Sequence, residues 1–214
     1  MLRIFVSTMG LVLLLGIAGC GDPNAGALFA EIQYATRCEM TRGCPGVVDH
    51  DICGFNRSDP CEEGMVEATL GCEATERDGT RSLTFSARQG SNVSLSVSGL
   101  VVPTNGGSAM GSSCRVTVRE GANTYSGSCG GSAPSEAQPC QINEVEFFDD
   151  MGNPTFEARL FCQFLENQAS PALAIEVTAV GAGPMPASTP ARIRFANCTG
   201  LTCTADTCIS VPEP

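Results

Sequence analysis

The sequence predicts an all-β protein, specifically an antiparallel β-sandwich of about seven to nine strands. Short runs in which apolar and polar residues alternate recur along the chain, and residues 93–98 alternate strictly. Residues typical of turns, such as Gly, Asp, Asn and Pro, separate these runs. No stretch between them has the length of a crossover helix, which argues against the parallel α/β classes. A sheet closed on itself is the alternative architecture.

The segment before residue 66 has the least regular pattern. Within residues 27–37, Leu28, Ile32 and Ala35 fall on one helical stripe, but the stretch is short and could equally begin as a strand. Residues 38–64 hold four cysteines and show little hydrophobic periodicity. We therefore expect a disulfide-stapled loop region there.

A predicted hairpin, a further strand and a loop follow. Residues 66–75 and 81–87 have strand composition, and Asp78-Gly79 between them is a strong hairpin signal. The half-buried strand at 93–98 extends toward residue 102, and a Gly/Ser-rich loop covers 104–113.

The hairpin at 114–129 makes the most specific structural prediction. Residues 114–119 alternate, Glu120 to Asn123 turn the chain, and residues 124–129 return. Pairing Arg119 with Thr124 places Cys114 opposite Cys129 in the ladder. Directly opposed strand residues lie about 4.5–5.5 Å apart at Cα, which is within reach of a disulfide.

The remaining strands are expected at residues 140–148, 155–165, 172–180 and 191–197. A turn at 149–154 joins the first two of these strands, and a Gly/Pro-rich turn at 181–190 precedes the last one.

Thirteen cysteines point to disulfides made in an oxidising compartment. The Cys-x-x-Cys pairs typical of zinc ribbons are missing from the sequence, which argues against zinc. Connectivity is not derivable from sequence; beyond Cys114–Cys129 we expect local bridges, Cys140 with Cys162 and either Cys198 or Cys203 with Cys208. The candidates for pairing are Cys38, Cys44, Cys53, Cys61, Cys72, Cys114, Cys129, Cys140, Cys162, Cys198, Cys203 and Cys208.

The N-terminal residues have the pattern of a targeting signal. Arg3 precedes an apolar run that ends in Ile17-Ala18-Gly19-Cys20 and is too short to span a bilayer. This ending resembles the lipobox of bacterial lipoproteins. The resemblance implies cleavage between Gly19 and Cys20 and a diacylglycerol thioether on Cys20. It also accounts for the odd number of cysteines, because removing Cys20 leaves twelve that can pair.

The lipobox also sets the expected organisation. We expect a signal peptide at 1–19, a lipidated tether at 20–26, a disulfide-rich segment at 27–65 and the β-sandwich at 66–214, with 27–214 forming one folded unit. Asp22 stands one place beyond the position that favours inner-membrane retention in enteric lipoproteins, so the outer membrane is favoured over the inner.

The composition limits the partners. About 195 residues remain after cleavage, enough for one domain with a sizeable core. The net charge of −11 argues against nucleic acid and against electrostatic attraction to anionic lipid headgroups. The expected partners are the membrane, through the acyl anchor, and another envelope protein or surface component. No cofactor is expected.

Few residues point to chemistry. His50, the one histidine, lies between Asp49 and Asp51, and the loop prediction places it in solvent. A hydrolase would require His50 to meet a Ser or a carboxylate in a cleft, and no Gly-x-Ser-x-Gly elbow accompanies it. Asp49 and Asp51 are the candidate Ca²⁺ ligands, although their spacing matches no EF-hand loop.

These observations favour a non-catalytic envelope protein that binds another surface component or coats the cell. A small-ligand or Ca²⁺-binding module is the first alternative, and a hydrolase is the second.

Overall fold

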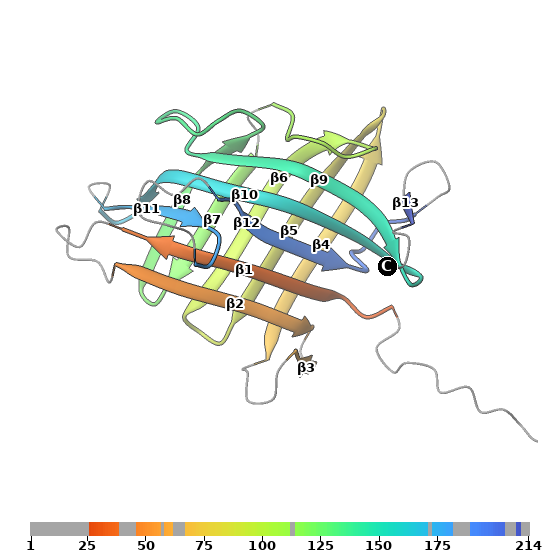
Figure 1. Ribbon diagram of the computed structural model, residues 1–214, viewed down its shortest axis with the longest axis horizontal. Helices are drawn as coiled ribbons and strands as arrows, with labels where there is room; N and C mark the ends of the chain where they lie inside the picture. Colours follow the sequence, from red (N-terminus) through yellow and green to blue (C-terminus); the bar gives the residue numbers. More distant parts are fainter. Residues whose placement is uncertain are drawn as a thin grey trace, which may run out of the picture.

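A computed structural model describes residues 26–38, 46–56, 58–61, 67–111, 114–170, 173–181, 189–203 and 209–210. Within these ranges the chain forms thirteen strands and no helix (Figure 1). Their bounds are β1 Phe29–Arg37, β2 Val47–Phe55, β3 Ser58–Pro60, β4 Ala68–Arg77, β5 Thr80–Gln89, β6 Val93–Pro103, β7 Cys114–Glu120, β8 Asn123–Gly130, β9 Cys140–Asp150, β10 Asn153–Asn167, β11 Ala174–Thr178, β12 Ala191–Ala196 and β13 Ile209–Ser210.

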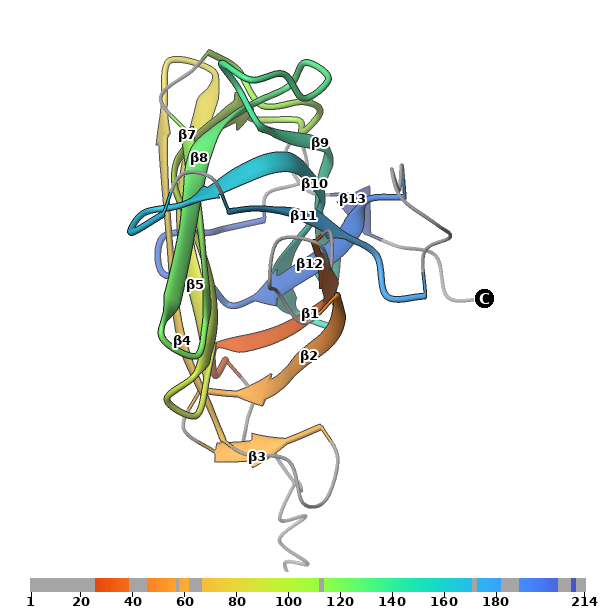
Figure 2. The same ribbon diagram turned by 90° about the vertical axis from the view of Figure 1, so that its left-hand side faces the viewer.

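All thirteen strands belong to one mostly antiparallel sheet that bends into two layers (Figure 2). The first layer is the meander β4 to β8, and the second contains β1, β2 and β9 to β12. Figure 1 shows the strands of the second layer running across those of the first. The all-β prediction is confirmed, whereas seven to nine strands is too few.

The link between the layers is hydrogen-bonded, so the layers are not two separate sheets. Cys129 and Gly130 of β8 pair in parallel with the start of β9. Tyr125 and Ser126 of the same strand pair with the end of β10. The predicted sandwich of two separate sheets is therefore not confirmed. The hydrogen-bonded order of strands runs from β3 at one edge of the sheet to β4 at the other. No ladder joins these two edge strands within the described residues.

The N-terminal segment is part of this sheet, which corrects two expectations. Residues 29–37 form the strand β1, so the helical alternative for this stretch is wrong. The loop expected over 38–64 is also wrong over Val47–Phe55, where β2 pairs with β1 along all nine residues. On its other edge β1 pairs first with β12 and then with β11, which lie end to end beside β10.

The core lies between the two layers and follows the period-2 pattern of the strands. Phe85 of β5 meets Phe156 of β10 and Phe195 of β12 at ring-centroid distances of 5.3 and 5.2 Å. All three rings are at most 1% exposed. Aromatic side chains bury large apolar areas, so this contact contributes strongly to the stability of the core.

Two predicted bridges are confirmed. Arg119 pairs with Thr124 as expected, and Cys114 is bonded to Cys129. Cys140 is bonded to Cys162. The strand β7 continues one residue further than expected, because Glu120 still pairs with Asn123 and only Gly121 and Ala122 form the turn.

Two further bridges have connectivities that the sequence left open. Cys53 is bonded to Cys61, and Cys72 of β4 is bonded to Cys198 after β12. The alternative Cys198–Cys208 is therefore wrong. Cys38 and Cys203 are also disulfide-bonded, and Cys44 and Cys208 lie outside the described residues.

The Cys72–Cys198 bridge secures the edge of the first layer. Thr199 accepts a hydrogen bond from the Ala74 amide at 2.8 Å and donates one to the Cys72 carbonyl at 3.1 Å. The segment after β12 thus covers the outer edge of β4, and such cover prevents edge-to-edge association of sheets.

Candidate functional site

His50 lies in the protein interior, contrary to the expectation of a solvent-exposed loop residue. It belongs to β2, stands opposite Tyr34 of β1, and its side chain is 7% exposed. The two rings are 4.7 Å apart at their centroids. The strand period explains this position, because every second residue of β2 points toward the first layer.

One carboxylate from the opposite layer meets this histidine. Glu120, at the end of β7, places Oε1 2.7 Å from His50 Nε2. The Thr36 hydroxyl of β1 also donates to Glu120 and lies 3.3 Å from the same His50 nitrogen. We name Tyr34, Thr36, His50, Glu120 and Tyr125 the Glu120 cluster.

The cluster gathers the single histidine and both tyrosines of the chain around one carboxylate. Burial, and to a lesser degree the negative charge of Glu120, raises the pKa of Tyr34. Burial also raises the pKa of Tyr125; a hydrogen bond with Asn167 opposes this shift, and Glu120 adds to it. Both phenols are therefore held in the neutral form.

The contacts of His50 argue against a hydrolytic triad. In a triad, one ring nitrogen faces the nucleophile and the other faces the carboxylate. Here Nε2 faces both Glu120 and Thr36. A proton on Nε2 that is donated to Glu120 leaves no lone pair there to accept a proton from Thr36. The cluster is instead a polar contact that joins the two layers.

The Ca²⁺ candidates lie on the outer face of the same strand. Asp49 and Asp51 alternate with His50, and Gln33 donates to Asp51 at 3.3 Å. Together with His50 and Val180 they line a hollow of about 180 Å³. Within the described residues no group of three or more His, Cys, Asp or Glu side chains is placed to hold a metal ion.

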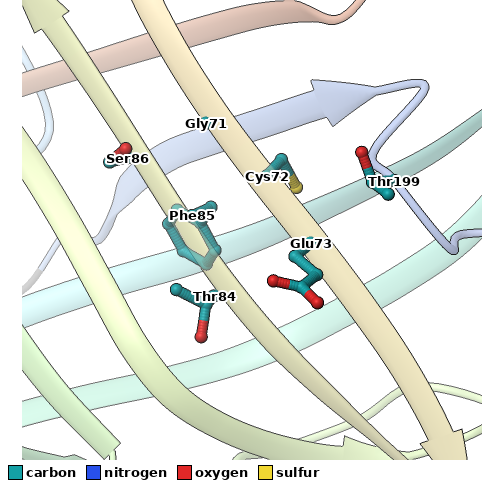
Figure 3. Close-up of a pocket in the computed structure, with 7 residues that line it drawn as sticks. All are labelled: Gly71, Cys72, Glu73, Thr84, Phe85, Ser86 and Thr199. Carbon is teal, nitrogen blue, oxygen red and sulfur yellow. The ribbon is translucent and has the colours of Figure 1, made fainter.

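A second hollow, of about 460 Å³, lies over β4 and β5 (Figure 3). Glu73 and Thr84 are cross-strand partners on one side of it, and Gly71 opposite Ser86 leaves the space open. A Cβ on Gly71 would lie 3.0 Å from the Ser86 hydroxyl. Its lining offers one carboxylate and several hydroxyls, without a base paired to a nucleophile.

A third hollow, of about 470 Å³, lies where the described chain begins. Phe29 and Phe55 line it with the turn between β9 and β10, and Arg194 and Asn197 also contribute. The Asn197 side-chain amide donates to the Ala27 carbonyl and to Asn153, both at 2.9 Å. This amide therefore fixes the start of the chain beside the β9–β10 turn.

No protein-family model, curated protein or solved structure matches this chain.

The lipidation and cleavage residues, Cys20 and Gly19, lie outside the described residues. The part of the chain that the structure describes holds no helix long and apolar enough to cross a bilayer. Sequence reasoning missed Glu120 as the partner of His50, because the two lie 70 residues apart and in different layers. The two-residue period of the strand could have placed Glu120 on the inward face, because it shares that face of β7 with Val116 and Val118.

Proposed function

We propose that this chain is an exported, lipid-anchored protein of the bacterial cell envelope, whose folded part is a non-catalytic β-sandwich module. One observation carries the proposal: every cysteine among the described residues is disulfide-bonded. Ten bonded cysteines suit a periplasmic or extracellular protein, because cytosolic reductants keep thiols reduced.

The number of cysteines in the sequence supports the anchor. Cys44 and Cys208 leave an even set with the ten bonded cysteines, and Cys20 is the odd one. Its position after Ile17-Ala18-Gly19 supports lipid attachment rather than pairing. The second residue after Cys20 is Asp22, which supports the outer membrane over the inner.

The role we assign to the module is to bind another surface component while held at the membrane. The absence of a relay at His50 supports a non-catalytic role, because the one histidine has both of its described polar contacts on a single nitrogen. The hollow in Figure 3 is open, and Glu73 is the one charged residue in its lining. This lining does not favour any class of small ligand over a protein partner.

Replacement of the lipid-bearing residue tests the proposal. We expect Cys20→Ala to abolish incorporation of labelled fatty acid and to move the protein from the detergent phase to the aqueous phase in a partitioning assay. The physical reason is that acyl chains supply the membrane affinity, at about 0.8 kcal/mol for each buried methylene.

The double variant Cys53→Ala/Cys61→Ala is the matched control. It removes two cysteines and one bridge but leaves Cys20 in place, so it should remain labelled and detergent-soluble. Unchanged labelling of Cys20→Ala would show that the anchor is wrong. Free thiols at several of the ten bonded positions in the native protein would argue against export.

A further inference from the structure

The turn between β9 and β10 has an unusual residue at its tip. Met151 is 88% exposed and adopts a left-handed backbone with φ of +52°. A side chain with a Cβ is strained in this region, and Gly, Asn or Asp are the residues that tolerate it best. Neither the turn nor the core explains a methionine here.

The chain builds the same turn elsewhere with a suitable residue. Between β4 and β5, Asp78 and Gly79 have φ values of +52° and +73°, and between β9 and β10, Met151 and Gly152 have +52° and +87°. Both are two-residue turns between antiparallel strands. Asp78 suits its turn and Met151 does not, so the turn geometry does not account for the methionine.

Met151 lies at the point where the chain leaves toward its proposed anchor. Gly26, the first described residue, lines the same hollow as Met151, Phe29 and Phe55. The Phe29 and Phe55 rings are 5.1 Å apart and only half-buried. We name Phe29, Phe55 and Met151 the tether rim. In Figure 1 the start of β1 and the β9–β10 turn lie side by side at the right.

The length of chain to the lipid limits where this rim can be. Gly26 is six positions after Cys20, and a fully extended chain covers at most about 20 Å over that length. A lipid on Cys20 is therefore held within about 20 Å of Gly26, which lines the same hollow as the tether rim.

We propose that the tether rim docks on the lipid surface, with Met151 inserted at the boundary between headgroups and acyl chains. This proposal rests on the lipid anchor proposed above. An unbranched, flexible methionine suits such a disordered apolar environment. The contact is apolar rather than electrostatic, because Asp150 beside Met151 already pairs with Arg194 and the chain is strongly acidic. Docking would fix the orientation of the module relative to the membrane.

A single-tryptophan measurement tests the docking, because the chain has no tryptophan. Met151→Trp and Asp78→Trp are purified with their lipid and reconstituted into phosphatidylcholine vesicles, with and without a doxyl-labelled quencher lipid. The two variants place the same ring at matched turns, and the β4–β5 turn lies away from the start of β1 in Figures 1 and 2. Flotation of the vesicles reports the anchor separately.

We expect both variants to float, and only Met151→Trp to show blue-shifted emission and at least twofold stronger quenching than Asp78→Trp, with little dependence on salt. Flotation with equal quenching of the two variants would overturn the docking and leave the anchor standing. Failure of both variants to float would overturn the anchor, and the docking with it.

Met151→Asn tests the premise that the methionine is not needed for folding. Asn tolerates the left-handed region, so this variant should raise the Tm by about 2–4 °C. A lower Tm would show that Met151 stabilises the fold and would remove the reason to assign it another role.

Discussion

At the scale of single residues, the Tyr34 hydroxyl is a buried group without a hydrogen-bond partner in the described part of the chain. Its ring is fully buried, and the hydroxyl has no hydrogen bond among the described residues. A buried donor that lacks a partner costs about 1–3 kcal/mol. We therefore expect Tyr34→Phe to raise the free energy of unfolding at pH 7 by about 1 kcal/mol, measured by urea denaturation. A loss of stability would show that the hydroxyl is bonded.

The same residue sets a pH dependence. The pKa of Tyr34 is raised in the folded state, above the value of 10.0 for an unperturbed tyrosine. Below pH 10 both states keep the proton and no stability is lost. Above pH 10 the unfolded state ionises first, so the free energy of unfolding falls as the pH rises. Tyr34→Phe should show a shallower fall in Tm on the alkaline side of pH 10 than the parent.

Glu120 should be the most sensitive member of its cluster. Its removal leaves the His50 ring and the Thr36 hydroxyl without their shared acceptor in a mostly buried position. We expect Glu120→Ala to lower the free energy of unfolding by about 2–3 kcal/mol, and Glu120→Gln, which keeps an acceptor oxygen, to lower it less.

An exposed glutamate provides the control for that experiment. Glu146 lies on the outer face of β9, so Glu146→Ala should change stability by no more than about 0.5 kcal/mol. Equal effects of Glu120→Ala and Glu146→Ala would show that the layers do not depend on the cluster.

The burial of His50 also explains why its strand was not foreseen. The inward positions of β2 carry Val48, His50 and Ile52, so a polar residue interrupts the alternation. The outward positions carry Asp49 and Asp51, which read as turn residues. A partner in another layer satisfies His50, and no local pattern can reveal such a partner.

At the scale of elements, the hairpins were predictable because their signals are local. Asp78-Gly79 and the alternation of residues 114–119 specify turns and registers that the structure contains. The short strands β3 and β13 have no comparable pattern, since three and two residues cannot show a period. The bend that joins the layers depends on long-range pairing and was not predictable.

Four cysteines stand in one row across that bend. Cys114, Cys129, Cys140 and Cys162 are successive ladder partners on β7, β8, β9 and β10. All four are at most 1% exposed. The two bridges of this row tie together the last two strands of the first layer and the first two of the second, so they hold the strands on each side of the link.

At the scale of the whole molecule, the Cys72–Cys198 bridge should contribute most to stability among the four bridges whose two cysteines both lie in the described residues. It closes a loop of 126 residues, against 8 for Cys53–Cys61. The chain-entropy relation gives about 4–5 kcal/mol for the long loop and about 2–3 kcal/mol for the short one. We expect Cys72→Ala/Cys198→Ala to lower the urea midpoint more than Cys53→Ala/Cys61→Ala does. The reverse order would show that the long bridge joins segments already close in the unfolded chain.

The position of β1 between β2, β11 and β12 has a consequence for the timing of folding. In a chain that crosses a membrane from its N-terminus, β1 emerges first and its partners at residues 174–196 emerge last. Until then β1 has only β2 beside it, and its other edge stays available to wrong partners. If the chain is exported as proposed, the second layer closes only when translocation is almost complete. On the proposal of export, translocation and completion of the sheet are therefore successive events, because one edge of β1 waits for residues 174–196.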